Sequence, residues 1–146
     1  LSHRTRCNRH LLVMNPDPTK TQYLFRINKG VLDVNESINS HMPEQEREIP
    51  FDNMIYFGDG ETDVPSMTVM MKSGGHAIAV HPPGGDTSKC EMLRKAGRID
   101  YFCPADYSEG SVLDELVKNT LRVIISRIYL RRQIFDLPPR GNMISQ

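Results

Sequence analysis

The stretch Met54-Ile55-Tyr56-Phe57-Gly58-Asp59-Gly60-Glu61-Thr62-Asp63 decides the fold, because it joins an apolar run to a helix start through a turn rich in glycine and acidic residues. The four apolar residues at its beginning are too few for a helix and are followed by turn residues, so they predict a buried strand. A helix is predicted from about residue 63 to 72, with Thr62 or Asp63 as its N-cap. Strand, sharp turn and helix in this order are the unit from which α/β proteins are built.

Short apolar runs and helix-like segments alternate along the rest of the chain. Further strands are predicted at residues 10–14, 77–80 and 99–102, and further helices at 19–29, 36–41, 88–96 and 111–133. The residues expected to be buried on the first and last of these helices are Tyr23, Leu24, Ile27, Leu113, Leu116, Val117, Leu121, Ile124, Ile125 and Ile128. This alternation predicts an α/β fold, a Rossmann-like three-layer αβα sandwich with a mostly parallel sheet. One domain over residues 1–137 and a flexible C-terminal tail over 138–146 are expected.

The composition restricts the class of partner. Lys and Arg together number 18, as do Asp and Glu, so the formal net charge is zero and no nucleic-acid partner is expected. No stretch comes near the ~18 consecutive apolar residues of a membrane span, and the first residues lack the apolar run of a secretory signal, so no membrane partner is expected. Three cysteines without a Cys-x-x-Cys pair fit a reducing compartment, and we expect a cytoplasmic protein. The sequence predicts no oligomeric state.

Acidic residues crowd the turn after residues 54–57, and ligands of parallel sheets bind beyond the carboxyl ends of strands. Asp59, Glu61 and Asp63 lie within five residues, and like charges this close oppose one another. A bound divalent cation removes that conflict, and oxygen ligands on a short loop suit Mg²⁺. The alternative is a solvated acidic turn in which Asp63 only caps a helix.

A basic residue opens the helix predicted at residues 19–29. Lys20 falls in its first turn, where the helix dipole disfavours a cation but where backbone N–H groups and an ammonium together attract an anion. The alternative is a surface lysine whose long side chain bends into water. Taken together, a metal site after one strand and a phosphate clamp at a helix start are what phosphoryl transfer requires.

These residues carry a resemblance to a known family. Ile55-Tyr56-Phe57-Gly58-Asp59-Gly60-Glu61-Thr62-Asp63 resembles the fourth motif of the haloacid dehalogenase (HAD) superfamily, a strand followed by Gly-Asp-x-x-x-Asp. Thr19-Lys20-Thr21-Gln22 resembles the third motif, whose fixed feature is a lysine. The amino-acid sequence of residues 20–30 and 49–65 is similar to that of HAD-like hydrolases nearest the phosphoserine-phosphatase branch, and the similarity is greatest over residues 15–80.

The resemblance implies a Mg²⁺-dependent phosphatase that acts on a small phosphate monoester. Asp59 would be a direct metal ligand, and Asp63 would be a metal ligand through water or the partner of the lysine. Lys20 would neutralise the nucleophile and the transferring phosphoryl group. Thr62 would hydrogen-bond near the metal and the substrate, whereas Glu61 would lie on the surface.

The sequence departs from the family in one respect. The first motif, Asp-x-Asp-x-Thr/Ser on a strand, does not occur in it. Family members form an aspartyl-phosphate on the first aspartate of that motif. The resemblance therefore implies the C-terminal part of a HAD hydrolase, a fragment expected to show no turnover alone. Because the nucleophile strand lies beside the fourth-motif strand in the family, residues 54–57 are expected to form a free, apolar sheet edge.

Two other classes of function stay open at this point. A catalytically inactive HAD-like module could serve in binding or as a scaffold, and the acidic residues would then be ordinary surface. A phosphoacceptor domain would instead carry its modification on an aspartate at the end of a strand, and Asp59 has that position.

Overall fold

The computed structural model describes residues 19–136, so the strand predicted at 10–14 and the tail predicted at 138–146 lie outside the described residues. The helices are α2 (Thr19–Lys29), α3 (Val64–Lys72), α4 (Ser88–Lys95) and α5 (Val112–Asp136). Single turns of 3-10 helix are η1 (Glu44–Glu46), η2 (Phe51–Asn53) and η3 (Glu61–Asp63). The strands are β1 (Ile55–Gly58), β2 (His76–His81) and β3 (Tyr101–Pro104).

The three strands form one parallel sheet in the order β1-β2-β3. Phe57 is the register partner of Ile78, and Ala79 is the partner of Phe102. The connection from β1 to β2 runs through α3, and the connection from β2 to β3 runs through α4. An α/β fold with a parallel sheet was predicted, and the described residues confirm it.

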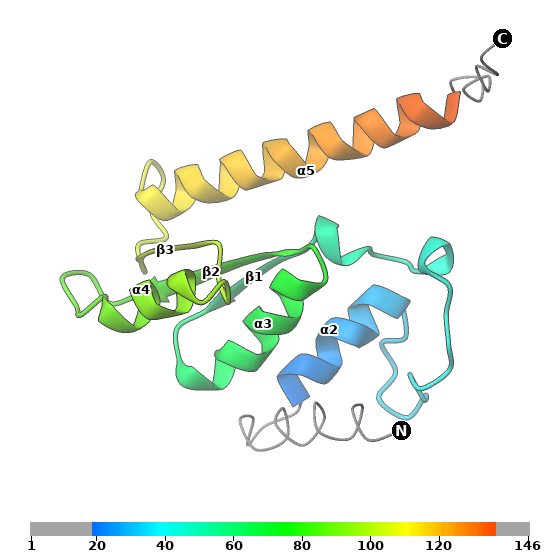
Figure 1. The fold of residues 1–146 in the computed structure, drawn as a ribbon, viewed down its shortest axis with the longest axis horizontal. Helices are drawn as coiled ribbons and strands as arrows, with labels where there is room; N and C mark the ends of the chain where they lie inside the picture. The colour runs from blue at the N-terminus through cyan, green and yellow to red at the C-terminus, as the bar shows by residue number, and fades with distance from the viewer. Residues whose placement is uncertain (1–18, 137–146) are drawn as a thin grey trace, which may run out of the picture.

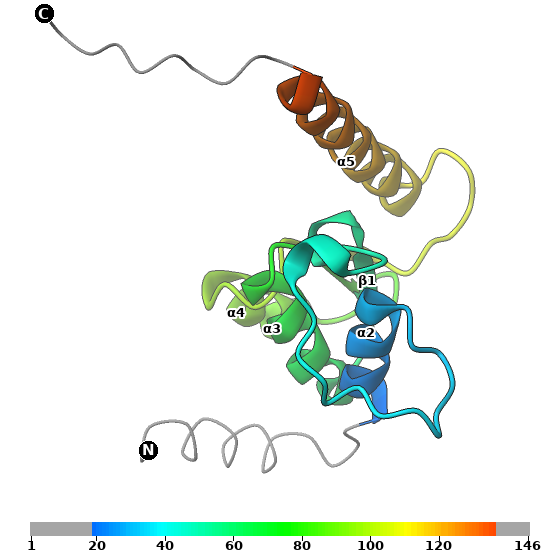
Figure 2. The ribbon, with the colours of Figure 1, turned by 90° about the vertical axis from the view of Figure 1, so that its right-hand side faces the viewer.

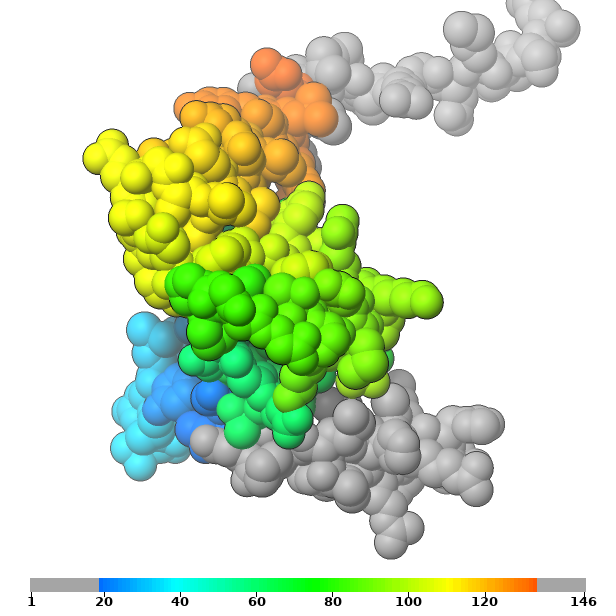
Figure 3. Space-filling view, turned by 90° about the vertical axis from the view of Figure 1, so that its left-hand side faces the viewer, coloured from blue at the N-terminus to red at the C-terminus, as the bar shows by residue number. Residues whose placement is uncertain are grey.

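Helices cover both faces of the sheet (Figures 1 and 2), and α5 lies on the face opposite α2 and α3. In the space-filling view of Figure 3, the green segments that include α3 and α4 lie between the yellow and orange α5 and the blue α2. The apolar core beneath the sheet includes Leu24, Met67, Met70, Ala77 and Ile99, and the smaller core under α5 includes Ile78, Val80, Cys103 and Leu113. This layering is compatible with a Rossmann-like fold.

Strand β1 is an edge of the sheet within the described residues, because it pairs with β2 alone. The side chain of Phe57 is 40% exposed there. Tyr23 and Ile27, on α2, are exposed as well, so the prediction that they are buried was wrong. The free apolar edge expected at residues 54–57 is thus present in the described part of the chain.

Helix α2 instead buries Leu24 together with two polar residues, Arg26 and Asn28. The guanidinium of Arg26 donates hydrogen bonds to four backbone carbonyls between residues 31 and 36, those of Val31, Asp33, Val34 and Glu36. Asn28 Nδ2 donates to the carbonyl of Ile49 at 2.9 Å. These polar groups are buried because they satisfy carbonyls of the connection that wraps around the helix.

Two other elements differ from the predictions. No helix forms at residues 36–41, where backbone carbonyls accept hydrogen bonds from Arg26 and Lys29 instead of continuing a helix. The strand predicted at 99–102 begins two residues later, because Asp100 caps the sheet by accepting a hydrogen bond from the Ala77 N–H at 3.0 Å.

The apolar stripe predicted on the last helix is buried only in part. Leu113 and Ile124 are buried, whereas Leu121 and Ile125 are exposed. Helix α5 has 25 residues, about 37 Å at 1.5 Å per residue. Strands of four to six residues span only about 13–20 Å, so the helix is longer than the sheet that it covers. Of the helices within residues 19–136, none combines the length and the apolar character that crossing a bilayer requires.

Candidate functional site

Three segments meet at the carboxyl end of β1. The first turn of α2 brings Lys20 to the turn η3, where its ammonium lies 2.9 Å from Asp63 Oδ1 and donates to Thr62 Oγ1 at 3.2 Å. More than forty residues separate Lys20 from both partners in the sequence. The structure therefore places three of the predicted site residues in direct contact, and Asp59 directly follows the last residue of β1 and lines the same hollow.

The turn needs glycine at position 58. A Cβ built on Gly58 would lie 2.6 Å from Asp63 Cβ and 2.9 Å from the terminal methyl of Met67, closer than real Cβ atoms approach other atoms. The missing side chain lets the Asp63 carboxylate fold back against the end of β1. Gly60, two residues further on, adopts an extended backbone.

Asp63 is the centre of the hydrogen bonds at this turn. Its Oδ1 accepts from the Lys20 ammonium at 2.9 Å and from the Tyr56 hydroxyl at 2.7 Å. Its Oδ2 accepts from the backbone N–H groups of Asp59 at 3.2 Å and Gly60 at 3.3 Å. The side chain is 7% exposed. Asp63 stands at the N-cap position of α3, as predicted, but its side chain makes no capping hydrogen bond to α3 and caps η3 instead.

The charge of Asp63 follows from these contacts. Burial would raise its pKa, but the hydrogen bonds from Lys20 and Tyr56 and the positive charge of Lys20 outweigh burial, and the pKa is lowered. Asp63 is therefore an anion at neutral pH and holds the Lys20 ammonium beside the turn. Of the two roles that the resemblance implies for Asp63, partner of the lysine is the one this geometry matches.

Tyr56 is a site residue that the sequence analysis missed. Burial and, after it, the hydrogen bond to Asp63 raise the pKa of its hydroxyl to about 12, so Tyr56 is a neutral donor at physiological pH. A signal for it was present in the sequence, because a tyrosine inside a buried apolar strand needs a hydrogen-bond partner for its hydroxyl. Asp63, seven residues later, supplies that partner.

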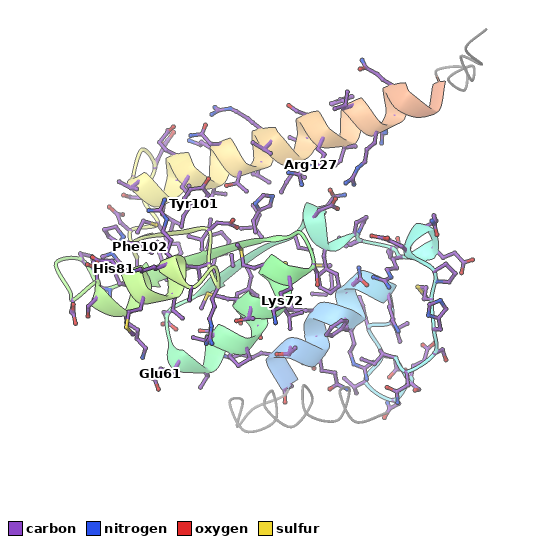
Figure 4. All side chains as sticks on the ribbon, in the orientation of Figure 1. Glu61, Lys72, His81, Tyr101, Phe102 and Arg127 are labelled. Carbon is purple, nitrogen blue, oxygen red and sulfur yellow. The ribbon has the colours of Figure 1, made fainter. Side chains whose placement is uncertain are left out.

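The other acidic residues of the turn have different surroundings. Glu61 is exposed, as predicted, and forms an ion pair with Lys89 of α4. The hydrogen bond from Lys89 lowers the pKa of Glu61. In Figure 4 Glu61 lies near one end of α3, and Lys72 lies near the other end. Asp59 is exposed and lines the same hollow as Lys20 and Asp63.

That hollow has a volume of about 770 Å³ and runs along the free edge of β1. Its walls are mainly apolar and include Ile55 and Phe57 of β1 and Tyr23 and Ile27 of α2. The charged groups Lys20, Asp59 and Asp63 lie at the end where β1 stops. A cation and carboxylates at one end of an open, otherwise apolar hollow can hold the polar end of a ligand.

The donor set can be compared with the needs of Mg²⁺. Within residues 19–136, no group of three or more His, Cys, Asp or Glu side chains is arranged to hold a metal ion. Both oxygens of Asp63 already accept hydrogen bonds from the protein, which leaves Asp59 as the carboxylate that faces the hollow. Mg²⁺ is often held by one or two carboxylates and completes its shell with water and substrate phosphate oxygens. Asp59 fits an ion of that kind, one shared with a phosphate group.

Comparison with known proteins adds one relative. An uncharacterized protein of Borreliella burgdorferi (strain ATCC 35210 / DSM 4680 / CIP 102532 / B31) is 33% identical to this chain over 97 residues. The matched region is 64% of this chain and 32% of that protein, so it spans about a third of the relative's length. No family model matches the sequence, and no solved structure matches it.

Proposed function

We propose that this chain is the C-terminal part of a Mg²⁺-dependent HAD-like phosphatase that acts on a small phosphate monoester. The observation that carries the proposal is the contact between Lys20 and Asp63 at the carboxyl end of β1, with Asp59 on the same turn. The resemblance to the third and fourth HAD motifs requires that these residues, distant in sequence, face one site. A contact of 2.9 Å between them meets that requirement.

Each residue has a role that follows from its surroundings. Asp59 would hold Mg²⁺, and the bound ion would neutralise charge on the phosphate oxygens. Lys20 would bind the phosphoryl group as a positive charge, and Thr62 would hydrogen-bond beside it. Asp63 holds the Lys20 ammonium in place through their ion pair.

The proposed reaction needs a second carboxylate as nucleophile. That carboxylate would attack phosphorus and displace the alcohol, and water would then release inorganic phosphate and regenerate the carboxylate. The first HAD motif that carries it is absent from this sequence. The free edge of β1, next to the charged end of the hollow, supports the addition of a nucleophile-bearing strand at that position.

A second candidate function is a catalytically inactive HAD-like module that binds but does not turn over its ligand. It is favoured by the four hydrogen bonds to Asp63, which give this carboxylate a structural role without any substrate. A Mg²⁺ titration separates the two candidates: the acidic residues of this module are ordinary surface, so it predicts no stabilisation by Mg²⁺.

Mg²⁺ is expected to raise the melting temperature of the chain through Asp59. At ten times its dissociation constant, an ion that binds only the folded state stabilises it by about 1.4 kcal/mol, a shift of a few degrees for a domain of this size. Asp59→Asn is expected to remove that shift. The measurement is thermal unfolding followed by circular dichroism across a Mg²⁺ titration.

Glu61→Gln is the matched control, because Glu61 lies on the same turn but forms its ion pair with Lys89 at the surface. It is expected to keep the full Mg²⁺ shift. An unchanged shift in Asp59→Asn, or no shift in the unmodified chain, would contradict the proposed metal site. Labelling of Asp59 by acetyl phosphate would favour a phosphoacceptor domain instead.

A further inference from the structure

Tyr56 joins β1 to the charged end of the hollow, and no motif assigns it a role there. We propose that Tyr56 is a positioning residue, which holds the Asp63 carboxylate so that Lys20 meets a phosphate group in the hollow. The inference rests on the function proposed above and adds to it a residue on which phosphate binding depends.

The geometry fixes both oxygens of Asp63. The Tyr56 hydroxyl donates to Oδ1 at 2.7 Å, and Lys20 donates to the same oxygen at 2.9 Å. Oδ2 is held by two backbone N–H groups of the turn. Tyr56 itself sits in the paired part of β1, where Ala77 of β2 is its register partner. Because β1 is paired with β2, the Tyr56 hydroxyl is held in place. Its hydrogen bond then orients the Asp63 carboxylate, and the carboxylate orients the Lys20 ammonium.

A second contact attaches the start of α2 to the same framework. Thr21 Oγ1 and Ser66 Oγ of α3 lie 3.0 Å apart, and Ser66 is fully buried. Ser66 also lies near enough to the Tyr56 hydroxyl to act on it: burial raises the pKa of Tyr56, and the Ser66 side chain lowers it by a smaller amount. The residue after Lys20 is thus held by Ser66, and Lys20 is held by the carboxylate that accepts the hydrogen bond of Tyr56.

Loss of the Tyr56 hydroxyl should affect the binding of phosphate and of Mg²⁺ differently. Without the Tyr56 hydroxyl, Oδ1 keeps Lys20 as its partner, so the carboxylate and the ammonium paired with it can shift from the position that suits phosphate. Phosphate binding depends on Lys20 and should weaken. Mg²⁺ binding depends on the Asp59 side chain, which acts on Tyr56 only through its charge and not through a hydrogen bond among the described residues, and should be preserved. A tyrosine that served only to stabilise the fold would affect both ligands together.

The test is Tyr56→Phe in the chain of residues 1–146. Three quantities are measured: the dissociation constant of inorganic phosphate in excess Mg²⁺, the dissociation constant of Mg²⁺ alone, and the melting temperature. Loss of one charge-assisted hydrogen bond predicts phosphate binding about tenfold weaker, with Mg²⁺ binding within about twofold of the original. Tyr101→Phe is the control, because Tyr101 is a partly exposed tyrosine on β3 and does not line the hollow.

Each possible result supports or overturns the positioning role of Tyr56. Unchanged phosphate binding in Tyr56→Phe would overturn the role of Tyr56 and leave the proposed function standing. If the affinities for phosphate and for Mg²⁺ fall equally, and the melting temperature falls as well, Tyr56 has a structural role only. An original chain that binds neither Mg²⁺ nor phosphate would overturn the proposed function and this inference with it. If Tyr56→Phe does not fold, Ser66→Ala must give the same split, about threefold on phosphate alone, or the inference fails.

Discussion

Asp63→Ala is expected to destabilise the folded chain by about 3 kcal/mol at neutral pH, because it removes the acceptor of four hydrogen bonds. Two backbone N–H groups and the Tyr56 hydroxyl would lose their partner at a part-buried position. The Lys20 side chain is 42% exposed, so its ammonium can turn into water, which keeps the cost at the low end for a buried ion pair. The measurement is urea unfolding of both proteins.

Asp59→Ala is the matched control for this prediction. Asp59 lies four residues before Asp63 and lines the same hollow, but its side chain is exposed whereas that of Asp63 is buried. Its replacement is expected to change the free energy of unfolding by less than about 0.5 kcal/mol, as for ordinary surface positions. Equal destabilisation by the two variants would show that the turn responds to any change and that Asp63 is not its centre.

The effect of Asp63 on stability should depend on pH in a known direction. The pKa of Asp63 is lower in the folded chain than its ordinary value, so the folded state is stabilised when the carboxylate is charged. That contribution is complete above the ordinary aspartate pKa, about 3.9, and is lost as the pH falls through the folded value. The difference in the free energy of unfolding between the original chain and Asp63→Ala should therefore shrink in acid. A difference that does not change with pH would contradict a stabilising role for the charged Asp63 carboxylate.

Arg26→Ala is expected to have an effect of similar size, about 3 kcal/mol, because a buried guanidinium that holds several carbonyls is lost together with its packing. Arg26 is 4% exposed, and its closest contact is to the Asp33 carbonyl at 2.6 Å. The loop carbonyls can regain water, which limits the loss. Amide hydrogen exchange over residues 31–36 should become at least about tenfold faster, since the loop is then free to open.

Arg94→Ala provides the comparison, because Arg94 is an exposed arginine of α4. It should leave both stability and the exchange of residues 31–36 within experimental error. Protection of that loop in Arg26→Ala equal to that in the original chain would show that the loop is held by other contacts.

The sequence predicted the elements well because each depends on local signals. The helix at residues 19–29 ends before Gly30, as predicted, where the backbone is left-handed with φ of 71°. The strand at 54–57 was predicted within one residue of the observed Ile55–Gly58. The proximity of Lys20 to Asp63 was expected because both follow predicted strands, at residues 10–14 and 54–57, and the carboxyl ends of parallel strands share one edge of a sheet.

The burial of α2 could not be predicted in the same way. Apolar spacing assigns Tyr23 and Ile27 to the core only if a partner covers them, and in the described residues they line the hollow beside β1. Arg26 and Asn28 are buried because of carbonyls in a connection whose path the sequence does not reveal. The contribution of Tyr56 was missed for a related reason, since its partner lies across a turn whose shape depends on Gly58.

The most direct measurement of the central claim is a titration of the chain with inorganic phosphate in excess Mg²⁺, followed by ³¹P NMR. If Lys20 is the phosphate clamp beside Asp59 and Asp63, Lys20→Met should weaken phosphate binding by at least about tenfold. Lys72→Met, at the far end of α3 in Figure 4, should leave the affinity unchanged. Equal phosphate affinity in Lys20→Met and the original chain would contradict a phosphate site at the end of β1.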